Sequence, residues 1–199
     1  MAGFLFANIE KNLQTQFIPA EPGDTITIPE VLHPIRGTLS IEWKSDLVIR
    51  GNSMVQSILS FSNQDACAQG ISITNSTNIT LEGFTVQDTK GDAIKIQYTD
   101  GIVFRHVKAE WTGGPKETNG AYGLYPVQCQ NVLIENSVSI GASDAGIYVG
   151  QSNDIVVRYN IAYDNVAGFE IEYTNNSDVY ENHSCHNAGG ILIFDLSDL

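Results

Sequence analysis

The sequence predicts an all-β fold, a right-handed parallel β-helix with three short strands per coil and an N-terminal capping helix. The main sign is a repeat: similar apolar segments open at glycines 23, 22 and 22 residues apart, at Gly123, Gly146, Gly168 and Gly190. Each segment alternates apolar and polar residues, as strands do. Residues 9–18 instead carry apolar side chains at helical spacing. A repeat of about 22–23 residues indicates a solenoid.

Two solenoid classes share this period. Leucine-rich repeats need a fixed leucine framework with an asparagine, and the sequence has none. Short β-branched segments, such as residues 146–149 and 155–157, fit the strands of a β-helix better. Coils stacked about 4.8 Å apart pair their backbones and bury one apolar interior. Asn160 and Asn182, at the same point of successive repeats, are predicted to stack at a bend.

The two ends of the chain are predicted to differ. Ile9, Leu13, Phe17 and Ile18 form the apolar face of a short helix that covers the first coil. Residues 1–37 are therefore assigned to the cap and first strand, and residues 38–199 to the coils. The last residues form an apolar strand with no visible cap. We expect a truncated chain, a surface through which the C-terminal coil self-associates, or both.

Composition narrows the function classes. The formal net charge is −13 and the pI about 4.4, so nucleic acid is not an expected partner because its phosphates are repelled. No apolar run approaches the roughly 20 residues that cross a bilayer. Residues 1–12 lack the basic lead-in and apolar core of a signal peptide. The three cysteines have no CxxC spacing and are predicted to be free thiols.

One coil is longer than the others. Ala93 and Gly123 are 30 residues apart (123 − 93), and the extra residues centre on positions 111–120. Insertions in solenoids become loops on one face, often the face that binds. Trp111, Lys116 and Glu117 in this loop are therefore candidate site residues, although a neutral surface excursion has the same length.

Strand alternation predicts which side chains face outward. Between inward apolar residues, one outward position recurs as Lys95, Tyr125, Tyr148 and Glu170, here called the central column. A parallel outward position, the flanking column, includes Gln97 and Glu172. Further candidates follow the strands or precede them in the turns: Gln128, Gln151 and Asp144.

These side chains suit a sugar chain. Aromatic faces pack on pyranose C–H groups, while amides and carboxylates bond hydroxyls. For an acidic polysaccharide, a cation must neutralise the substrate carboxylate, and a base and an acid must move protons. Lys95 or Lys116 can neutralise or act as base, and Tyr125 or Tyr148 can act as base or acid. Hydrolysis by two carboxylates is another route, with Asp144 and Glu170 as the pair.

A structural interpretation of the same residues stays open. Stacked tyrosines on a flat sheet also serve as cross-strand ladders that favour register. The second function class is therefore a non-catalytic binding or structural module that self-associates through its C-terminal coil. The candidate catalytic set is Lys95, Tyr125, Tyr148, Glu170, Asp144 and Lys116, and the candidate substrate-binding set is Gln97, Trp111, Glu117, Gln128, Gln151 and Glu172.

A family resemblance joins these observations. Residues 88–95, 111–120, 122–128 and 143–152 resemble bacterial parallel β-helix repeat proteins of the pectate-lyase-like superfamily. The resemblance covers nearly the whole chain and is specific for fold rather than for activity. It implies carbohydrate work by analogy with polysaccharide lyases, C5-epimerases and glycoside hydrolases.

The resemblance also sets expectations beyond the fold. The chain lacks the Asp-Pro-His-Asp signature of the epimerases, which counts against that activity. Calcium is a cofactor by analogy, although no pectate-lyase-like calcium cluster is visible. Relatives of this kind are exported or periplasmic and often longer, so the resemblance suggests such a location for a chain in which no leader is recognised.

Overall fold

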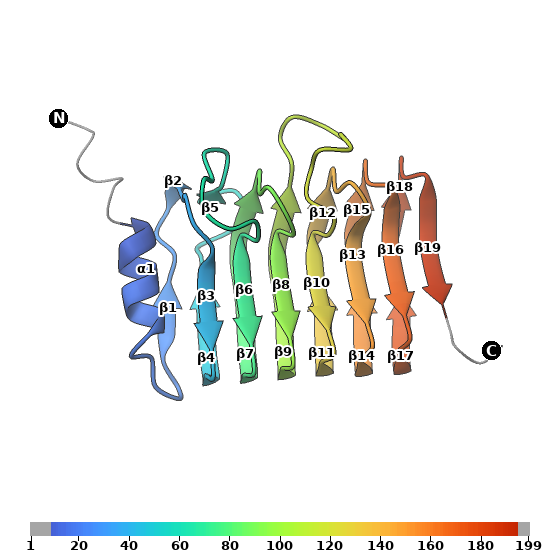
Figure 1. The fold of residues 1–199 in the computed structure, drawn as a ribbon. Helices are drawn as coiled ribbons and strands as arrows, with labels where there is room; N and C mark the ends of the chain where they lie inside the picture. The colour runs from blue at the N-terminus through green and yellow to red at the C-terminus, as the bar shows by residue number, and fades with distance from the viewer. Residues whose placement is uncertain (1–8, 195–199) are drawn as a thin grey trace.

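The computed structural model describes residues 9–194, and its strands stack into a straight parallel β-helix (Figure 1). The predicted parallel β-helix is thus confirmed. One sheet has the order β1-β4-β7-β9-β11-β14-β17 with β2, β5, β12, β15 and β18 joined beside this path, and the other has the order β3-β6-β8-β10-β13-β16-β19. The elements are α1 (Ile9–Phe17), β1 (Thr25–Thr27), β2 (Val31–Pro34), β3 (Leu39–Glu42), β4 (Ser45–Arg50), β5 (Ser57–Ser60), β6 (Ile71–Thr74), β7 (Thr77–Gln87), β8 (Ile94–Gln97), β9 (Asp100–Glu110), β10 (Leu124–Val127), β11 (Gln130–Glu135), β12 (Val138–Ile140), β13 (Ala145–Gly150), β14 (Asn153–Arg158), β15 (Ile161–Tyr163), β16 (Ala167–Glu172), β17 (Asn175–Tyr180), β18 (His183–Cys185) and β19 (Gly189–Phe194).

Parallel pairing keeps successive coils in register. In the seven-stranded sheet, Leu124 lies opposite Ile94 in the preceding coil and opposite Ile147 in the following one. These three side chains are fully buried. Because each coil buries its inward residues against the coils above and below, one continuous apolar interior runs along the solenoid.

Asparagine ladders satisfy the backbone at the bends. The Asn160 amide Nδ2 donates to the Ile134 carbonyl at 2.9 Å, and its Oδ1 accepts from the Ser137 N–H at 2.9 Å. Asn182 repeats the arrangement one coil later, since its Oδ1 accepts from the Asn160 N–H at 3.0 Å. The predicted Asn160–Asn182 stack is confirmed. A second ladder, Asn165 above Asn187, was not predicted.

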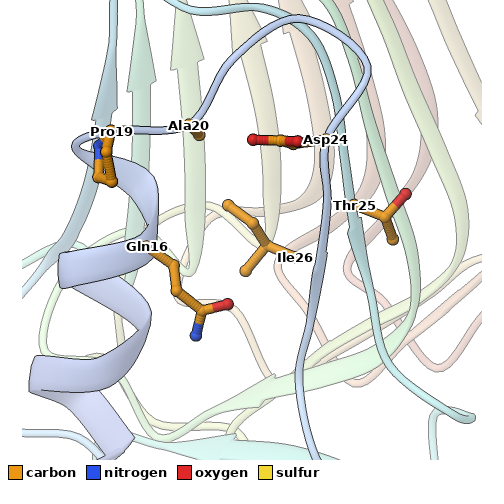
Figure 2. Close-up of a pocket in the computed structure, with 6 residues that line it drawn as sticks. All are labelled: Gln16, Pro19, Ala20, Asp24, Thr25 and Ile26. Carbon is orange, nitrogen blue, oxygen red and sulfur yellow. The ribbon is translucent and has the colours of Figure 1, made fainter.

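The helix covers the first coil through an apolar side and one glutamine. Leu13 and Phe17 are buried, and Gln14 exchanges two hydrogen bonds with the backbone of Ser40 in β3. The helix ends at Phe17, so the prediction for Ile18 was wrong: its side chain is 69% exposed. Figure 2 shows the hollow of about 330 Å³ that remains between α1 and β1.

Some sequence predictions fall at or beyond the edges of the described chain. The leader prediction concerns residues that are mostly outside it, as is half of the C-terminal run 190–199. The proposed boundary at residue 37 stays a prediction. Within residues 9–194, no helix is long and apolar enough to span a membrane.

A row of opposite charges runs along the outer side of the larger sheet. Glu82 pairs with Arg50, while Glu135 lies between Arg105 and Arg158 and accepts at 2.7 Å from each. The Glu135 side chain is 9% exposed. Burial opposes its ionisation, but the bonds from both arginines prevail and lower its pKa.

We expect Glu135→Gln to lower the free energy of unfolding by about 1–2 kcal/mol at neutral pH, because both arginines lose a charged acceptor. A lowered carboxyl pKa stabilises the fold above the pKa of the unfolded chain, and this contribution disappears as pH falls through the lowered value. Urea unfolding should therefore separate variant from wild type at neutral pH and not in acid. Glu82→Gln, which loses one exposed arginine contact, should cost less; an equal cost contradicts the role of Glu135.

Candidate functional site

The central column is aligned by strand register. Lys95 of β8 pairs with Tyr125 of β10, and Tyr148 of β13 pairs with Glu170 of β16. Leu124 and Val127, on either side of Tyr125, pair with Ile147 and Gly150 of β13. Tyr125 therefore lies next to Tyr148 in the following coil. Four side chains that are distant in sequence therefore stand in consecutive coils on the outer face of one sheet, over roughly 14 Å at about 4.8 Å per coil.

Three tyrosines form the centre of this face. Tyr125 and Tyr148 have ring centroids 5.0 Å apart, and Tyr122 lies 4.6 and 4.7 Å from them. We call Tyr122, Tyr125 and Tyr148 the tyrosine cluster. The Lys95 ammonium lies 5.0 Å from the centroid of Tyr125, within range of a cation–π contact. Tyr122 was not among the predicted site residues, because it precedes β10 and the alternation of inward and outward side chains applies only within strands.

Tyr148 is held by a glycine and a carboxylate. A Cβ at Gly150 would lie 2.5 Å from Cε1 of Tyr148, so the ring lies across the glycine backbone. The Tyr148 hydroxyl donates to Glu172, and 7% of the residue is exposed. Burial, followed by the bond to Glu172, raises the pKa of Tyr148. Tyr148 is thus a fixed, protonated support of the cluster more than an open contact surface.

Carboxylates surround the cluster. Burial is the main cause that raises the pKa of Tyr122, and the carboxylate of Asp144 raises it further. Burial is also the main cause that raises the pKa of Glu170, and the charges of Asp144 and Glu172 add to it. Asp92 also has a raised pKa, because its burial outweighs the attraction of Lys95. With Glu172, four carboxyl groups stand around the tyrosines and Lys95, which makes the face anionic when all are ionised.

Amide side chains border the cluster. Gln97, at the end of β8, donates from Nε2 to Oε1 of Gln128 at 2.7 Å. Gln128 and Gln151 occupy the same position after successive strands, and Gln151 is exposed. The structure thus brings Gln97, Gln128, Gln151 and Glu172 to one edge of the central column, as the register predicted. Their roles in binding stay predictions.

Trp111 requires a correction. Its side chain was predicted to bind substrate, but it is 4% exposed and its indole Nε1 donates to the Thr89 carbonyl at 2.8 Å. The ring packs beneath the long loop, where a Cβ at Gly120 would lie 2.7 Å from Cζ2 of the indole. Trp111 therefore anchors the loop, since the glycine leaves room for its ring.

Lys116 and Glu117 lie on the loop that rises above the strands in Figure 1. Both line a hollow of about 210 Å³ together with the turns that precede β13 and β16, including Ser143 and Val166. The Lys116 ammonium lies back over its own loop, 2.8 Å from where a Cβ of Gly113 would stand. The structure thus places these two residues over the turns, and not among the outward side chains of the central column.

The described residues do not fit a resident calcium ion. Calcium takes 6–8 oxygen ligands, mainly carboxylates and carbonyls, as a rough guide. Among residues 9–194, no three His, Cys, Asp or Glu side chains are grouped so that they could hold a metal. No chemical step is therefore assigned to a metal.

Comparisons with known proteins identify the architecture. A family model described as "Right handed beta helix region" matches residues 42–198. No curated protein matches the chain by sequence. Among solved structures, the A-module of the Azotobacter vinelandii mannuronan C-5 epimerase AlgE4 has a TM-score of 0.60 at 18% identity, covering 89% of this chain and 53% of that one.

Two further solved structures have a similar fold. The AlgE6 A-module of the same organism has a TM-score of 0.60 at 16% identity over 88% of this chain and 52% of its own. An alginate lyase from Paenibacillus sp. str. FPU-7 also has a TM-score of 0.60, at 14% identity. The match covers 87% of this chain and 73% of that one. The chain spans about half the length of the two epimerase modules. At these identities the likeness establishes the fold, including the predicted right-handed coil.

Replacing Glu170 by Gln should raise stability at neutral pH by about 0.5–1 kcal/mol, because a carboxylate that is disfavoured by burial and by neighbouring carboxylates becomes neutral. A raised carboxyl pKa means that ionisation destabilises the fold, and this cost disappears below the pKa of the unfolded chain. Thermal unfolding from acid to neutral pH checks this: the advantage of Glu170→Gln should grow with pH. Glu42→Gln, on an exposed position at the far end of the same sheet, is the control; an equal gain there contradicts the explanation.

Proposed function

The chain belongs to the right-handed β-helix family, and from this membership and the geometry of its tyrosine cluster we propose that it binds a polysaccharide along the outer face of β8, β10, β13 and β16. The observation that carries the proposal is the cluster itself, three rings within 5.0 Å of one another among carboxyl and amide groups. The solved structures that share the fold are named as alginate-modifying or alginate-cleaving proteins, which supports the same substrate class.

The chemistry of this face fits sugars. Tyr122 and Tyr125 are partly exposed and offer aromatic surface to pyranose C–H groups. Gln97, Gln128 and Asp144 supply acceptors and donors for hydroxyls on either side of the rings. Because equivalent positions recur in each coil, an extended polymer contacts an outward side chain of every coil along its length.

The finer proposal is that the polymer is acidic and is cleaved or epimerised. Lys95 neutralises a substrate carboxylate, and a base removes the proton from the neighbouring carbon. In cleavage the C–O bond to the departing sugar breaks as a C=C bond forms and an acid protonates the departing oxygen; in epimerisation an acid returns a proton to the opposite face of the same carbon. Tyr125 is partly exposed and keeps its proton because burial raises its pKa, so we assign it the donor role, whereas the Tyr148 hydroxyl is engaged with Glu172. Asp92, whose pKa is raised by burial and whose charge interacts with that of Lys95, is a stronger base than an ordinary carboxylate and takes the proton.

Hydrolysis is the alternative reaction, and it depends on two carboxyl groups of the same face. A glycosidase needs one carboxyl group that holds a proton and one that is ionised. The raised pKa of Glu170 suits the acid, and Asp144, whose charge contributes to that rise, suits the ionised partner. This route needs no anionic substrate and therefore suits a neutral polymer.

Tyr125→Ala should weaken oligosaccharide binding about tenfold, because it removes an aromatic contact of about 0.5–1.5 kcal/mol and unseats its neighbouring rings. Calorimetric titration with oligoalginate, oligogalacturonate and cello-oligosaccharides measures this. Tyr163→Ala, on β15 in the other sheet, is the control. Wild-type protein that binds none of the three, or an equal loss in the control, contradicts the proposed function.

The same oligosaccharides distinguish an acidic from a neutral substrate, and binding from catalysis. An acidic oligomer should bind more tightly as pH falls, because Asp92 and Glu170 become neutral at higher pH than ordinary carboxyl groups. Elimination produces new ultraviolet absorbance and hydrolysis produces reducing ends without it. Binding of neutral oligomers alone would remove the acidic-substrate version, and binding without ultraviolet absorbance or reducing ends would remove elimination and hydrolysis.

A second candidate is a non-catalytic module that self-associates through its C-terminal coil. The observation that favours it is the apolar surface of β19, where Ile191, Ile193 and Phe194 are 44%, 69% and 44% exposed. In the described residues, β19 pairs with β16 along one edge. Strands with an open edge and apolar side chains readily pair with another chain.

This candidate predicts concentration-dependent association in analytical ultracentrifugation. Ile193→Lys should shift the protein towards monomer, because a charge at the strand edge opposes pairing. Val55→Lys, which changes a residue that is 78% exposed near the opposite end of the solenoid, should leave association unchanged. A wild-type protein that stays monomeric over the whole concentration range contradicts self-association.

A further inference from the structure

One bend of the solenoid repeats the same backbone conformation in six successive coils. In six strands of the seven-stranded sheet, β3, β6, β8, β10, β13 and β16, the residue that follows the strand has a positive φ, between 50° and 56°. Strand register continues through this position, because the residues just before it pair from coil to coil. These six strands point downward in Figure 1, and the row follows their ends. We call it the turn row: Trp43, Asn75, Tyr98, Gln128, Gln151 and Tyr173.

The fold explains the conformation but not the residue types. Left-handed backbone costs roughly 1–2 kcal/mol for most residues and less for asparagine, which makes Asn75 the ordinary choice. Trp43, Tyr98 and Tyr173 carry bulky rings in the same strained conformation. What distinguishes the turn row from other bends with a positive φ is that its three rings lie in one line beside the tyrosine cluster.

Burial does not explain these rings either. Trp43 is 75% exposed, Tyr98 55% and Tyr173 36%, so none of them contributes a full side chain to the core. Trp43 also borders a hollow of about 470 Å³ next to α1, with Ser40 and Glu42 in its wall. The three rings are therefore surface groups whose accessible faces can receive a ligand.

The turn row is continuous with the tyrosine face. Gln128 of the row bonds Gln97, and Glu172, which precedes Tyr173, accepts from the Tyr148 hydroxyl. Tyr98 lies two coils from Trp43 and three coils from Tyr173, so the rings span five coils, or roughly 24 Å at about 4.8 Å per coil. That length fits a polymer and exceeds a single sugar.

Resting on the proposed function, we propose that Trp43, Tyr98 and Tyr173 are stacking platforms for successive parts of a glycan that runs along the solenoid beside the tyrosine cluster. Their ring faces receive pyranose C–H groups. Gln128 and Gln151, between Tyr98 and Tyr173 in the row, bond the hydroxyls of the same chain. The site thereby selects long oligosaccharides over short ones.

The test replaces each ring by Asn, which accepts the left-handed backbone: Trp43→Asn, Tyr98→Asn, Tyr173→Asn and the triple variant. Affinity is measured by calorimetry for trisaccharides and decasaccharides of mannuronate and of cellulose. We expect the triple variant to lose about tenfold or more in decasaccharide affinity, with trisaccharide affinity unchanged and a thermal midpoint equal to or above wild type. Tyr159→Asn is the matched control, because Tyr159 has a φ of 57° and is 46% exposed at a different bend.

Three outcomes overturn the platforms while leaving glycan binding by wild type in place. The first is a triple variant that binds decasaccharides as wild type does, and the second is an equal loss in Tyr159→Asn. A triple variant that loses trisaccharide and decasaccharide affinity equally also overturns them, because the rings would then act within the central site. If wild type binds neither series at any length, the proposed function fails and the platforms fail with it.

Discussion

The backbone ladder between coils is the constraint on which the rest of this structure depends. Parallel pairing lets the residues of each strand bond only those one coil before and one coil after. Every position of the repeat consequently becomes a line of side chains along the solenoid. There are five such lines: the apolar interior, the asparagine ladders, the charge row, the tyrosine face and the turn row. Strand register aligns the residues of each one.

The same constraint distributes charge between the two sheets. On the larger sheet Arg50, Arg105 and Arg158 alternate with glutamates, so these cations neutralise their neighbours. On the tyrosine face the opposite balance holds, since Lys95 stands among carboxyl groups whose pKa values rise with burial. The tyrosine face is therefore rich in acceptors and aromatic surface, with a positive charge at Lys95.

The repeat made most of this architecture predictable from sequence. Alternation placed Lys95, Tyr125 and Glu170 on one surface because strand geometry leaves only two directions for a side chain. Tyr122 and Trp111 lie outside the strands, where no period applies and the loop's own contacts decide. Trp111 is buried because Gly120 admits its ring and Thr89 accepts its N–H, and neither contact has a signature in the sequence.

The nearly constant rise of the coils has a consequence for how such a molecule changes. Duplicating or deleting one complete repeat between β8 and β16 would lengthen or shorten the outer face by a single strand spacing, about 4.8 Å, and leave the inward and outward assignments intact. A one-residue insertion within a strand would instead reverse them. The length of the outer face can therefore change by whole coils without altering which side chains point outward.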